Sequence, residues 1–215
     1  MAKCYIVGAG EFYGIPTPSE GDLVIAADGG YDTLCSLGIK CDILLGDMDS
    51  LSHAAKSSDA ESLLTKAGLS NTEIITFPVK KDETDTHLAY LEGVRRGYSD
   101  FELYGCVGGR EDHTFANYSL LLYGKNRGHR ITLVGDRREI FVIKNETKAI
   151  HGRPGATLSL FAIGGDCDGV SIKGALYEVE NITLTAEFPL GVSNAFKEES
   201  VSISCGGALM VIKYL

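Results

Sequence analysis

Short apolar runs recur through the first two-thirds of the chain, at a length and spacing typical of buried strands. The runs are CYIVG (4–8), DLVIAA (22–27), DILLG (42–46), EIITF (73–77), FELYGCV (101–107) and ITLVG (131–135). Between some of them, apolar residues recur at helical spacing: Leu88, Leu91 and Val94, then Phe115, Tyr118, Leu121 and Leu122. Continuous apolar strands that alternate with helices indicate an α/β domain with a parallel sheet covered on both faces.

The pattern changes after about Lys144. The later segments are short, β-rich and separated by Gly, Asn, Asp or Pro, and they read ATLSLFAI, GVSIKGA, NITLTAEF, ESVSISC and ALMVIKYL. This pattern predicts an all-β sandwich or barrel. We therefore expect an α/β domain over residues 1–144 and an all-β domain over residues 145–215.

Composition and charge limit the kind of partner. The chain has 215 residues, 44% of them hydrophobic, and a formal net charge of -9, which disfavours nucleic acid and acidic membrane surfaces. Its six cysteines form no C-x-x-C pair, and no run approaches the roughly 20 apolar residues of a membrane span. We expect a cytoplasmic protein that binds neither nucleic acid nor membranes.

Polar clusters follow the predicted strands at the points where those strands end. The clusters are AADGG with Asp28, GDMDS with Asp47 and Asp49, KKDETDTH with Asp82, Thr84 and Asp85, and GGREDHTFAN with Arg110, Asp112, His113 and Asn117. In open α/β sheets, ligands bind at the carboxyl ends of the strands. The clusters therefore predict one binding site built from several loops.

Asp47 and Asp49 are the strongest candidates for a metal site. In an extended segment, residues two apart point to the same side, so both carboxylates can face one position. Two like charges about 4 Å apart repel by roughly 4 kcal/mol at an effective dielectric near 20, so a cation between them is favoured. Oxygen ligands beside a phosphate suit Mg²⁺. The alternative is that Asp47 caps a turn and Asp49 caps the following helix.

The two later clusters carry groups that suit a polyphosphate. Thr84 or Asp85 is a plausible N-cap, which leaves backbone N–H groups free to bind a phosphate oxygen. Arg110 offers a planar fork for phosphate, and His113 and Asn117 share a helix face at i, i+4. Each of these residues, taken singly, is more often an ordinary surface residue than a ligand.

Taken together, the motifs resemble the thiamine pyrophosphokinase family. The matching blocks are AADGGYDTLCSLGIKCDILLGDMDSL, KKDETDTHLAY and GCVGGREDHTFAN, in this order, with a weaker match at GVSNAF. The resemblance implies transfer of the pyrophosphoryl group of ATP to thiamine, giving thiamine diphosphate and AMP, with Mg²⁺ as cofactor. It also implies a Rossmann-like, mostly parallel sheet domain followed by an all-β sandwich that binds thiamine and dimerises, in a homodimer whose site combines both chains.

The resemblance assigns roles to individual residues. Asp47, Asp49 and Asp85 are expected to bind the metal and act in catalysis, and whether Asp85 is also the general base stays open. The expected substrate-binding residues are Asp28, Gly29 and Gly30 for the nucleotide, Lys81, Thr84, Arg110, Asp112, His113 and Asn117 near the polyphosphate, and Ser193 and Asn194 for thiamine. The chain has no Trp to face the cationic thiazolium. Tyr177 is a candidate substitute, although a packed strand aromatic is its more ordinary role.

Other functions match fewer motifs. GAGEFYG suggests a Rossmann dehydrogenase, but its glycine spacing is one residue too long, and no P-loop motif occurs. A metal-dependent phosphatase could use DMDSL as its nucleophile motif, although that motif usually follows the first strand. A noncatalytic nucleotide or thiamine-diphosphate sensor would use the same carboxylates, so turnover is the property that distinguishes it.

Overall fold

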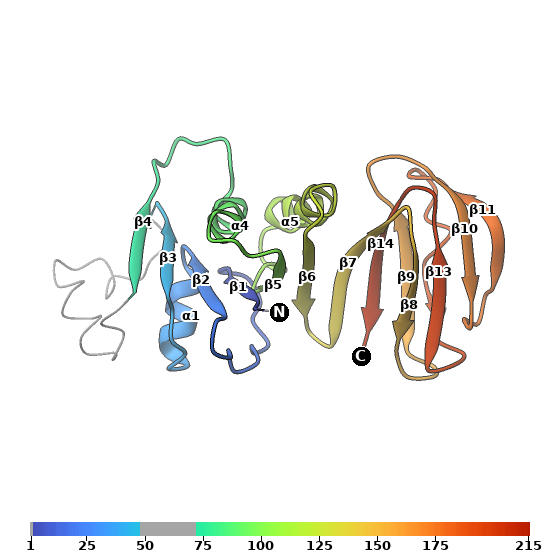
Figure 1. Cartoon of the computed structure of the whole chain (residues 1–215), viewed down its shortest axis with the longest axis horizontal. Helices are drawn as coiled ribbons and strands as arrows, with labels where there is room; N and C mark the ends of the chain where they lie inside the picture. The colour runs from blue at the N-terminus through green and yellow to red at the C-terminus, as the bar shows by residue number, and fades with distance from the viewer. Residues whose placement is uncertain (1, 48–71) are drawn as a thin grey trace. The chain divides into compact units, whose positions relative to one another are not determined.

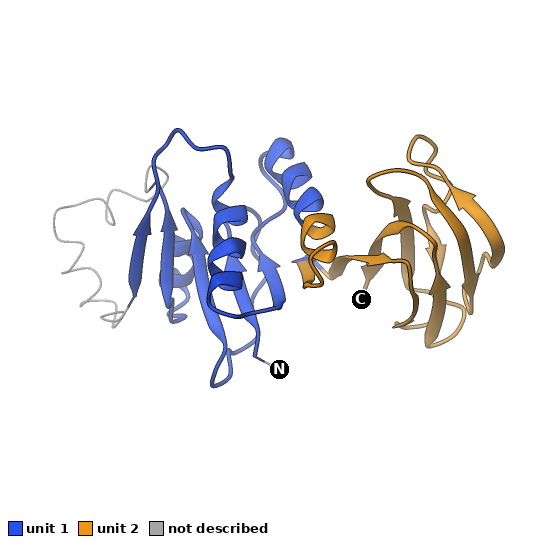
Figure 2. Cartoon of the chain, turned by 45° about the horizontal axis from the view of Figure 1, so that its top comes forward, with its two compact units in different colours: residues 1–120, 134–136 blue, residues 121–133, 137–215 orange. Residues whose placement is uncertain are grey.

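The computed structural model describes residues 2–47 and 72–215. The chain divides into two compact units, which Figure 2 colours separately. Unit 1 comprises Met1–Leu120 and Val134–Asp136, and unit 2 comprises Leu121–Leu133 and Arg137–Leu215. No helix in the described ranges is long and apolar enough to cross a membrane.

Unit 1 is built on a parallel sheet, which confirms the predicted α/β class. Its strands, in spatial order, are β5 (Asp100–Tyr104), β1 (Cys4–Val7), β2 (Leu23–Ala27), β3 (Ile43–Gly46) and β4 (Glu73–Thr76). The helices within the described residues are α1 (Gly30–Ser36), α4 (Asp85–Arg95) and α5 (Glu111–Lys125), labelled in Figure 1, and α5 continues into unit 2 after Leu120. The predicted strands and both predicted helices are present, whereas α1 was not predicted.

Strands β1, β2 and β3 of unit 1 are apolar and fully buried because both faces of the sheet are covered there. Tyr5 and Val7 of β1 belong to the core that includes Leu34 of α1. Cys4, which points the opposite way, lies against α4, where a Cβ on Gly93 would come within 2.9 Å of its sulfur. Glycine at this position therefore lets α4 pack closely on the sheet.

The strand order creates a crevice beside β1. The chain passes from β1 to β2, β3 and β4 in one direction, and then returns to β5 on the other side of β1. The connections that follow β1 and β5 therefore lead to strands on opposite sides of this pair. Such a switch point is the usual ligand site of an open α/β sheet.

Unit 2 is a sandwich of antiparallel strands. One layer contains β12 (Asn194–Ala195), β9 (Thr157–Ala162), β14 (Ala208–Tyr214) and β7 (Arg138–Lys144), in that order. The other contains β11 (Val179–Leu184), β10 (Cys167–Lys173), β13 (Ser200–Ser204) and β8 (Thr147–His151). Leu160 and Leu209 of the first layer share one core with Ile172 and Ile203 of the second.

Two strands lie near the predicted domain boundary. β6 (Arg130–Gly135) divides between the two units, and β7 precedes residue 145 but belongs to unit 2. The reason is long-range pairing, because β7 pairs with β14 from Arg138 to Lys144. The assignment of separate roles to residues 1–144 and 145–215 stays a prediction.

Candidate active site

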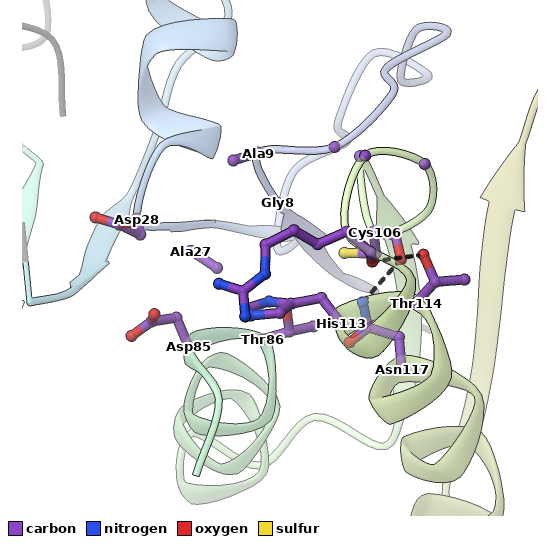
Figure 3. A pocket seen from close by; sticks show the side chains of 15 residues that line it. Gly8, Ala9, Ala27, Asp28, Asp85, Thr86, Cys106, His113, Thr114 and Asn117 are labelled. Atoms are coloured by element: carbon purple, nitrogen blue, oxygen red, sulfur yellow. Dashed lines mark hydrogen bonds between the residues drawn. The ribbon is translucent and has the colours of Figure 1, made fainter. Parts of the chain in front are cut away.

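A cleft of about 310 Å³ lies at the switch point of unit 1. In Figure 3, Asp28 and Asp85 lie on one side of this cleft, and His113, Thr114 and Asn117 of α5 lie on the other. The residues that line it are Gly8, Ala9, Gly10, Ala27, Asp28, Asp85, Thr86, Gly105, Cys106, Gly108, Gly109, Arg110, His113, Thr114 and Asn117. Most of the predicted polar clusters therefore contribute to one cleft.

The loops after β1 and β5 approach each other so closely that only glycine fits between them. A Cβ on Gly8 would lie 2.7 Å from the carbonyl oxygen of Gly105, and one on Gly10 would lie 2.5 Å from that of Val107. The N–H of Gly10 donates to the Gly105 oxygen at 2.7 Å. These two loops thus form a cleft wall made largely of backbone.

The D-G-G motif forms the turn from β2 into α1. Asp28 is 8% exposed and has a φ of 47°, a left-handed conformation that Asp tolerates better than most residues. A Cβ on Gly30 would lie 2.0 Å from the carbonyl oxygen of Val7, so this glycine is required by packing. Asp28 lines the cleft, but Gly29 and Gly30 do not.

Lys81 joins two of the predicted catalytic aspartates. Its ammonium lies 2.8 Å from a carboxylate oxygen of Asp85 and 3.7 Å from one of Asp47. Burial opposes the charge on Lys81, yet the negative charges of Asp85, Asp47 and Asp28 raise the pKa of this lysine above its usual value. The lysine is therefore protonated at neutral pH. Asp49 lies outside the described residues.

Thr84 is the N-cap of α4, as predicted for this motif. Its side-chain oxygen accepts a hydrogen bond from the N–H of His87 at 3.2 Å. Asp85 is the first helical residue, where a carboxylate is stabilised by the positive end of the helix dipole. Thr84 does not line the cleft, so its position indicates that it orients Asp85.

Arg110 and His113 lie at the cleft, whereas Asp112 lies beside it. The guanidinium of Arg110 pairs with both carboxylate oxygens of Asp112, at 3.1 and 2.6 Å. This pairing lowers the pKa of Asp112 to about 2. Asp112 also accepts a hydrogen bond from the N–H of His113 at 3.0 Å, so it orders the first turn of α5.

Asn117 supports the loop that follows β5. Its side chain is 4% exposed, and its amide nitrogen donates to the carbonyl oxygen of Cys106 at 2.7 Å. Figure 3 draws this hydrogen bond across the base of the cleft. The amide holds the loop in place and also lines the cleft.

Ser193 and Asn194 belong to unit 2. Ser193 is exposed with a φ of 61°, and its N–H donates to the hydroxyl oxygen of Ser159 at 3.0 Å. The Asn194 side chain is buried, accepts from the N–H of Tyr177 at 3.0 Å and donates to the Tyr177 carbonyl at 2.8 Å. Asn194 therefore fixes the backbone of a residue whose own side chain is 65% exposed.

A larger cavity of about 650 Å³ lies near the amino end of β2, with residues 15–22 and 38–40 among its lining. Two of the carboxylates that line it already accept hydrogen bonds from backbone N–H groups. Asp22 accepts from the N–H of Lys3 at 2.7 Å, and Asp42 accepts from the N–H of Val24 at 3.0 Å. This cavity lies at the wrong end of the strands for the predicted site, so we assign function to the smaller cleft.

Comparison with protein families identifies the family of this chain. The family model for the catalytic domain of thiamin pyrophosphokinase matches residues 18–133, and the model for its vitamin B1 binding domain matches residues 140–210. The chain belongs to the thiamin pyrophosphokinase family. It is therefore an enzyme of the kinase class, and the resemblance predicted from the motifs is confirmed.

Individual thiamin pyrophosphokinases are similar over nearly the whole chain. The Bacillus subtilis enzyme is 23% identical over 201 residues, covering 90% of this chain and 87% of its own. Its crystal structure matches with a TM-score of 0.85 at 24% identity, covering 99% of this chain and 98% of its own. The structure from Candida albicans matches with a TM-score of 0.79 at 15% identity, covering 100% and 89%. These structures support the fold assignment.

The carboxylates of Asp47 and Asp85 are donors of the kind that Mg²⁺ prefers. Asp47 and Asp85 lie against one ammonium group, so their oxygens already converge on a cation. Within residues 2–47 and 72–215, no three His, Cys, Asp or Glu side chains gather closely enough to hold a metal ion. A pair of carboxylates suits Mg²⁺, which normally completes its coordination with water and substrate phosphates.

Thr86, Cys106 and Thr114 also line the cleft but were not predicted. Burial raises the pKa of the Cys106 thiol to about 12, so this cysteine is not a nucleophile. The sequence G-A-G directly follows the first strand, and this position could have indicated that Gly8 and Gly10 line the cleft.

We predict that Asn117→Ala weakens nucleotide binding by loosening the loop after β5. Losing the hydrogen bond to the Cys106 carbonyl should lower the free energy of unfolding by about 1–3 kcal/mol and raise the dissociation constant for ATP. Urea unfolding and equilibrium ATP binding measure the two effects. Asn126→Ala, at an exposed position just beyond α5, is the control and should change stability by no more than about 0.5 kcal/mol. Wild-type ATP affinity in a folded Asn117→Ala protein would contradict this role.

Proposed function

We propose that this enzyme transfers the pyrophosphoryl group of ATP to thiamine, giving thiamine diphosphate and AMP. The observation that carries the proposal is the cluster of Asp47, Lys81 and Asp85, of which Asp85 lines the switch-point cleft, in a chain that matches both domains of the family. The cleft is lined by backbone, by the carboxylates of Asp28 and Asp85 and by the guanidinium of Arg110, which suits a nucleotide polyphosphate bound with a metal ion.

The proposed reaction needs no nucleophilic side chain. The hydroxyl oxygen of thiamine attacks the β-phosphorus of ATP, and the bond between this phosphorus and the oxygen bridging to the α-phosphate breaks. AMP leaves with that oxygen, and the hydroxyl proton is released. Catalysis of such a transfer is mainly in-line positioning and neutralisation of phosphate charge.

We assign the charged residues of the cleft to these two tasks. Asp47 and Asp85, with Asp49, would hold Mg²⁺, which when bound neutralises phosphate charge in the transition state. Lys81 is proposed to neutralise the polyphosphate directly. The ion pair of Arg110 with Asp112 is exposed, with 70% of the Arg110 side chain accessible, so exchanging this carboxylate for a bound phosphate costs little.

Unit 2 is proposed to bind thiamine. The exposed ring of Tyr177 could cover the cationic thiazolium, as a cation–π contact requires. Asn194 would act by fixing the Tyr177 backbone, and exposed Ser193 would contact the vitamin directly. Ser193 and Asn194 thus both remain residues of the proposed thiamine site, but Asn194 acts by positioning Tyr177.

We further propose that the enzyme works as a homodimer in the cytoplasm. Large apolar side chains are exposed around the proposed thiamine region of unit 2: Leu176, Tyr177, Phe188, Leu190 and Val192. A second copy that covers them would remove this surface from water. All six cysteines are free, which suits a reducing compartment supplied with ATP.

The first test identifies the products. Incubation of the protein with ATP, Mg²⁺ and thiamine should yield AMP and thiamine diphosphate in equal amounts, as measured by chromatography. Formation of ADP and thiamine monophosphate would disprove pyrophosphoryl transfer. Binding of nucleotide without turnover would support a sensor instead.

The second test removes one carboxylate from the proposed metal site. Asp47→Asn should lower turnover by about a hundredfold or more, because the transition state loses metal-centred charge stabilisation. The control is Asp136→Asn, an exposed substitution in the turn after β6, which should keep wild-type turnover. If Asp47→Asn kept both its rate and its Mg²⁺ dependence, Asp47 would only shape a turn.

The third test asks whether two chains build each active site. We expect unit 1 of one chain to work with unit 2 of its partner. Asp47→Asn and Asn194→Ala chains, each inactive alone, should then recover activity when refolded together. Random mixing makes half of the dimers mixed, each with one intact site, so about a quarter of wild-type activity is expected. No recovery, with mixed dimers confirmed by mass, would mean that each site lies within one chain.

A further inference from the structure

Lys81 occupies the position where two metal-binding candidates converge. Its side chain is 12% exposed, and those of Asp47 and Asp85 are 13% and 24% exposed. Charges that are this well shielded from water interact more strongly than charges at the surface. The ammonium therefore compensates the two carboxylates in the protein without ligands.

The same arrangement disfavours a divalent cation in the free protein. Mg²⁺ entering beside Lys81 would meet a positive charge that is already paired with both Asp47 and Asp85. Mg²⁺ must therefore either displace the Lys81 ammonium or bind next to it against electrostatic repulsion. An ATP polyphosphate, with about four negative charges, reverses this balance, because it can accept both the metal ion and the ammonium.

We infer that Lys81 is a built-in counter-ion that keeps divalent metal off Asp47 and Asp85 until a nucleotide polyphosphate arrives. This inference rests on the proposed function insofar as the polyphosphate binds in this cleft. It adds to that function an order in which the metal ion and the nucleotide bind. The metal binds tightly only together with nucleotide, and the free enzyme keeps its carboxylates neutralised by its own lysine.

The test measures metal binding without nucleotide. Mn²⁺ is titrated into the full-length protein, and the unbound ion is measured by electron paramagnetic resonance. Lys81→Met and Lys81→Gln remove the charge and should bind Mn²⁺ about tenfold more tightly, or better, than wild type. Lys81→Arg keeps the charge and should stay near wild type, and circular dichroism confirms that each variant is folded.

Two controls connect the effect to this site. Lys40→Met removes a lysine that also pairs with an aspartate, Asp42 at 2.6 Å, and should leave Mn²⁺ affinity unchanged. Adding Asp47→Asn to Lys81→Met should abolish the gain. Unchanged affinity in the neutral Lys81 variants, an equal gain in Lys81→Arg, or a gain that survives Asp47→Asn would each overturn the inference.

The outcome is separable from that of the proposed function. The Mn²⁺ titration contains neither ATP nor thiamine, so tighter binding by the neutral variants supports the counter-ion role even if the product assay fails. Conversely, formation of AMP and thiamine diphosphate by a protein whose Lys81 variants bind Mn²⁺ like wild type would keep the enzyme assignment and remove the counter-ion role.

Discussion

The close approach of backbone segments at the carboxyl end of the sheet is the constraint on which the cleft depends. Carbonyl oxygens fill the volumes that side chains would need at Gly8, Gly10 and Gly30. The first loop and the loop after β5 also satisfy part of each other's hydrogen bonding, as between the N–H of Gly10 and the oxygen of Gly105. The wall is therefore pre-formed, and the charged groups are arranged around a backbone frame rather than a flexible loop.

The cations near this frame already have anionic partners. Lys81 lies with Asp85 and Asp47, and Arg110 lies with Asp112, in a chain whose net charge is -9. A largely buried charge without a partner would be costly, so the pairing of Lys81 with Asp85 and Asp47 is stabilising. In the proposed function, substrate binding is an exchange of partners, in which phosphate oxygens replace carboxylates around the same cations.

Much of the fold could be predicted because burial on both faces makes the strands of unit 1 read as apolar runs. α1 was missed because it is short, begins at Gly30 and has no side-chain N-cap hydrogen bond. β7 was missed because its pairing with β14 joins distant parts of the chain. The motifs correctly placed Asp28, Asp85 and Arg110 at one cleft, but spacing alone cannot disclose burial. The bonds of Asn117 and Asn194 to the main chain were therefore not foreseeable.

The hydrogen bonds between the Asn194 side chain and the Tyr177 backbone have a consequence for which side chains can stand at position 177. On Tyr177 the amide binds the backbone N–H and carbonyl, groups that every residue except proline presents alike. The ring itself takes no part in the attachment and projects into solvent. These backbone hydrogen bonds do not depend on the side chain at position 177. That side chain can therefore change, in evolution or by design, while the backbone around it keeps its conformation.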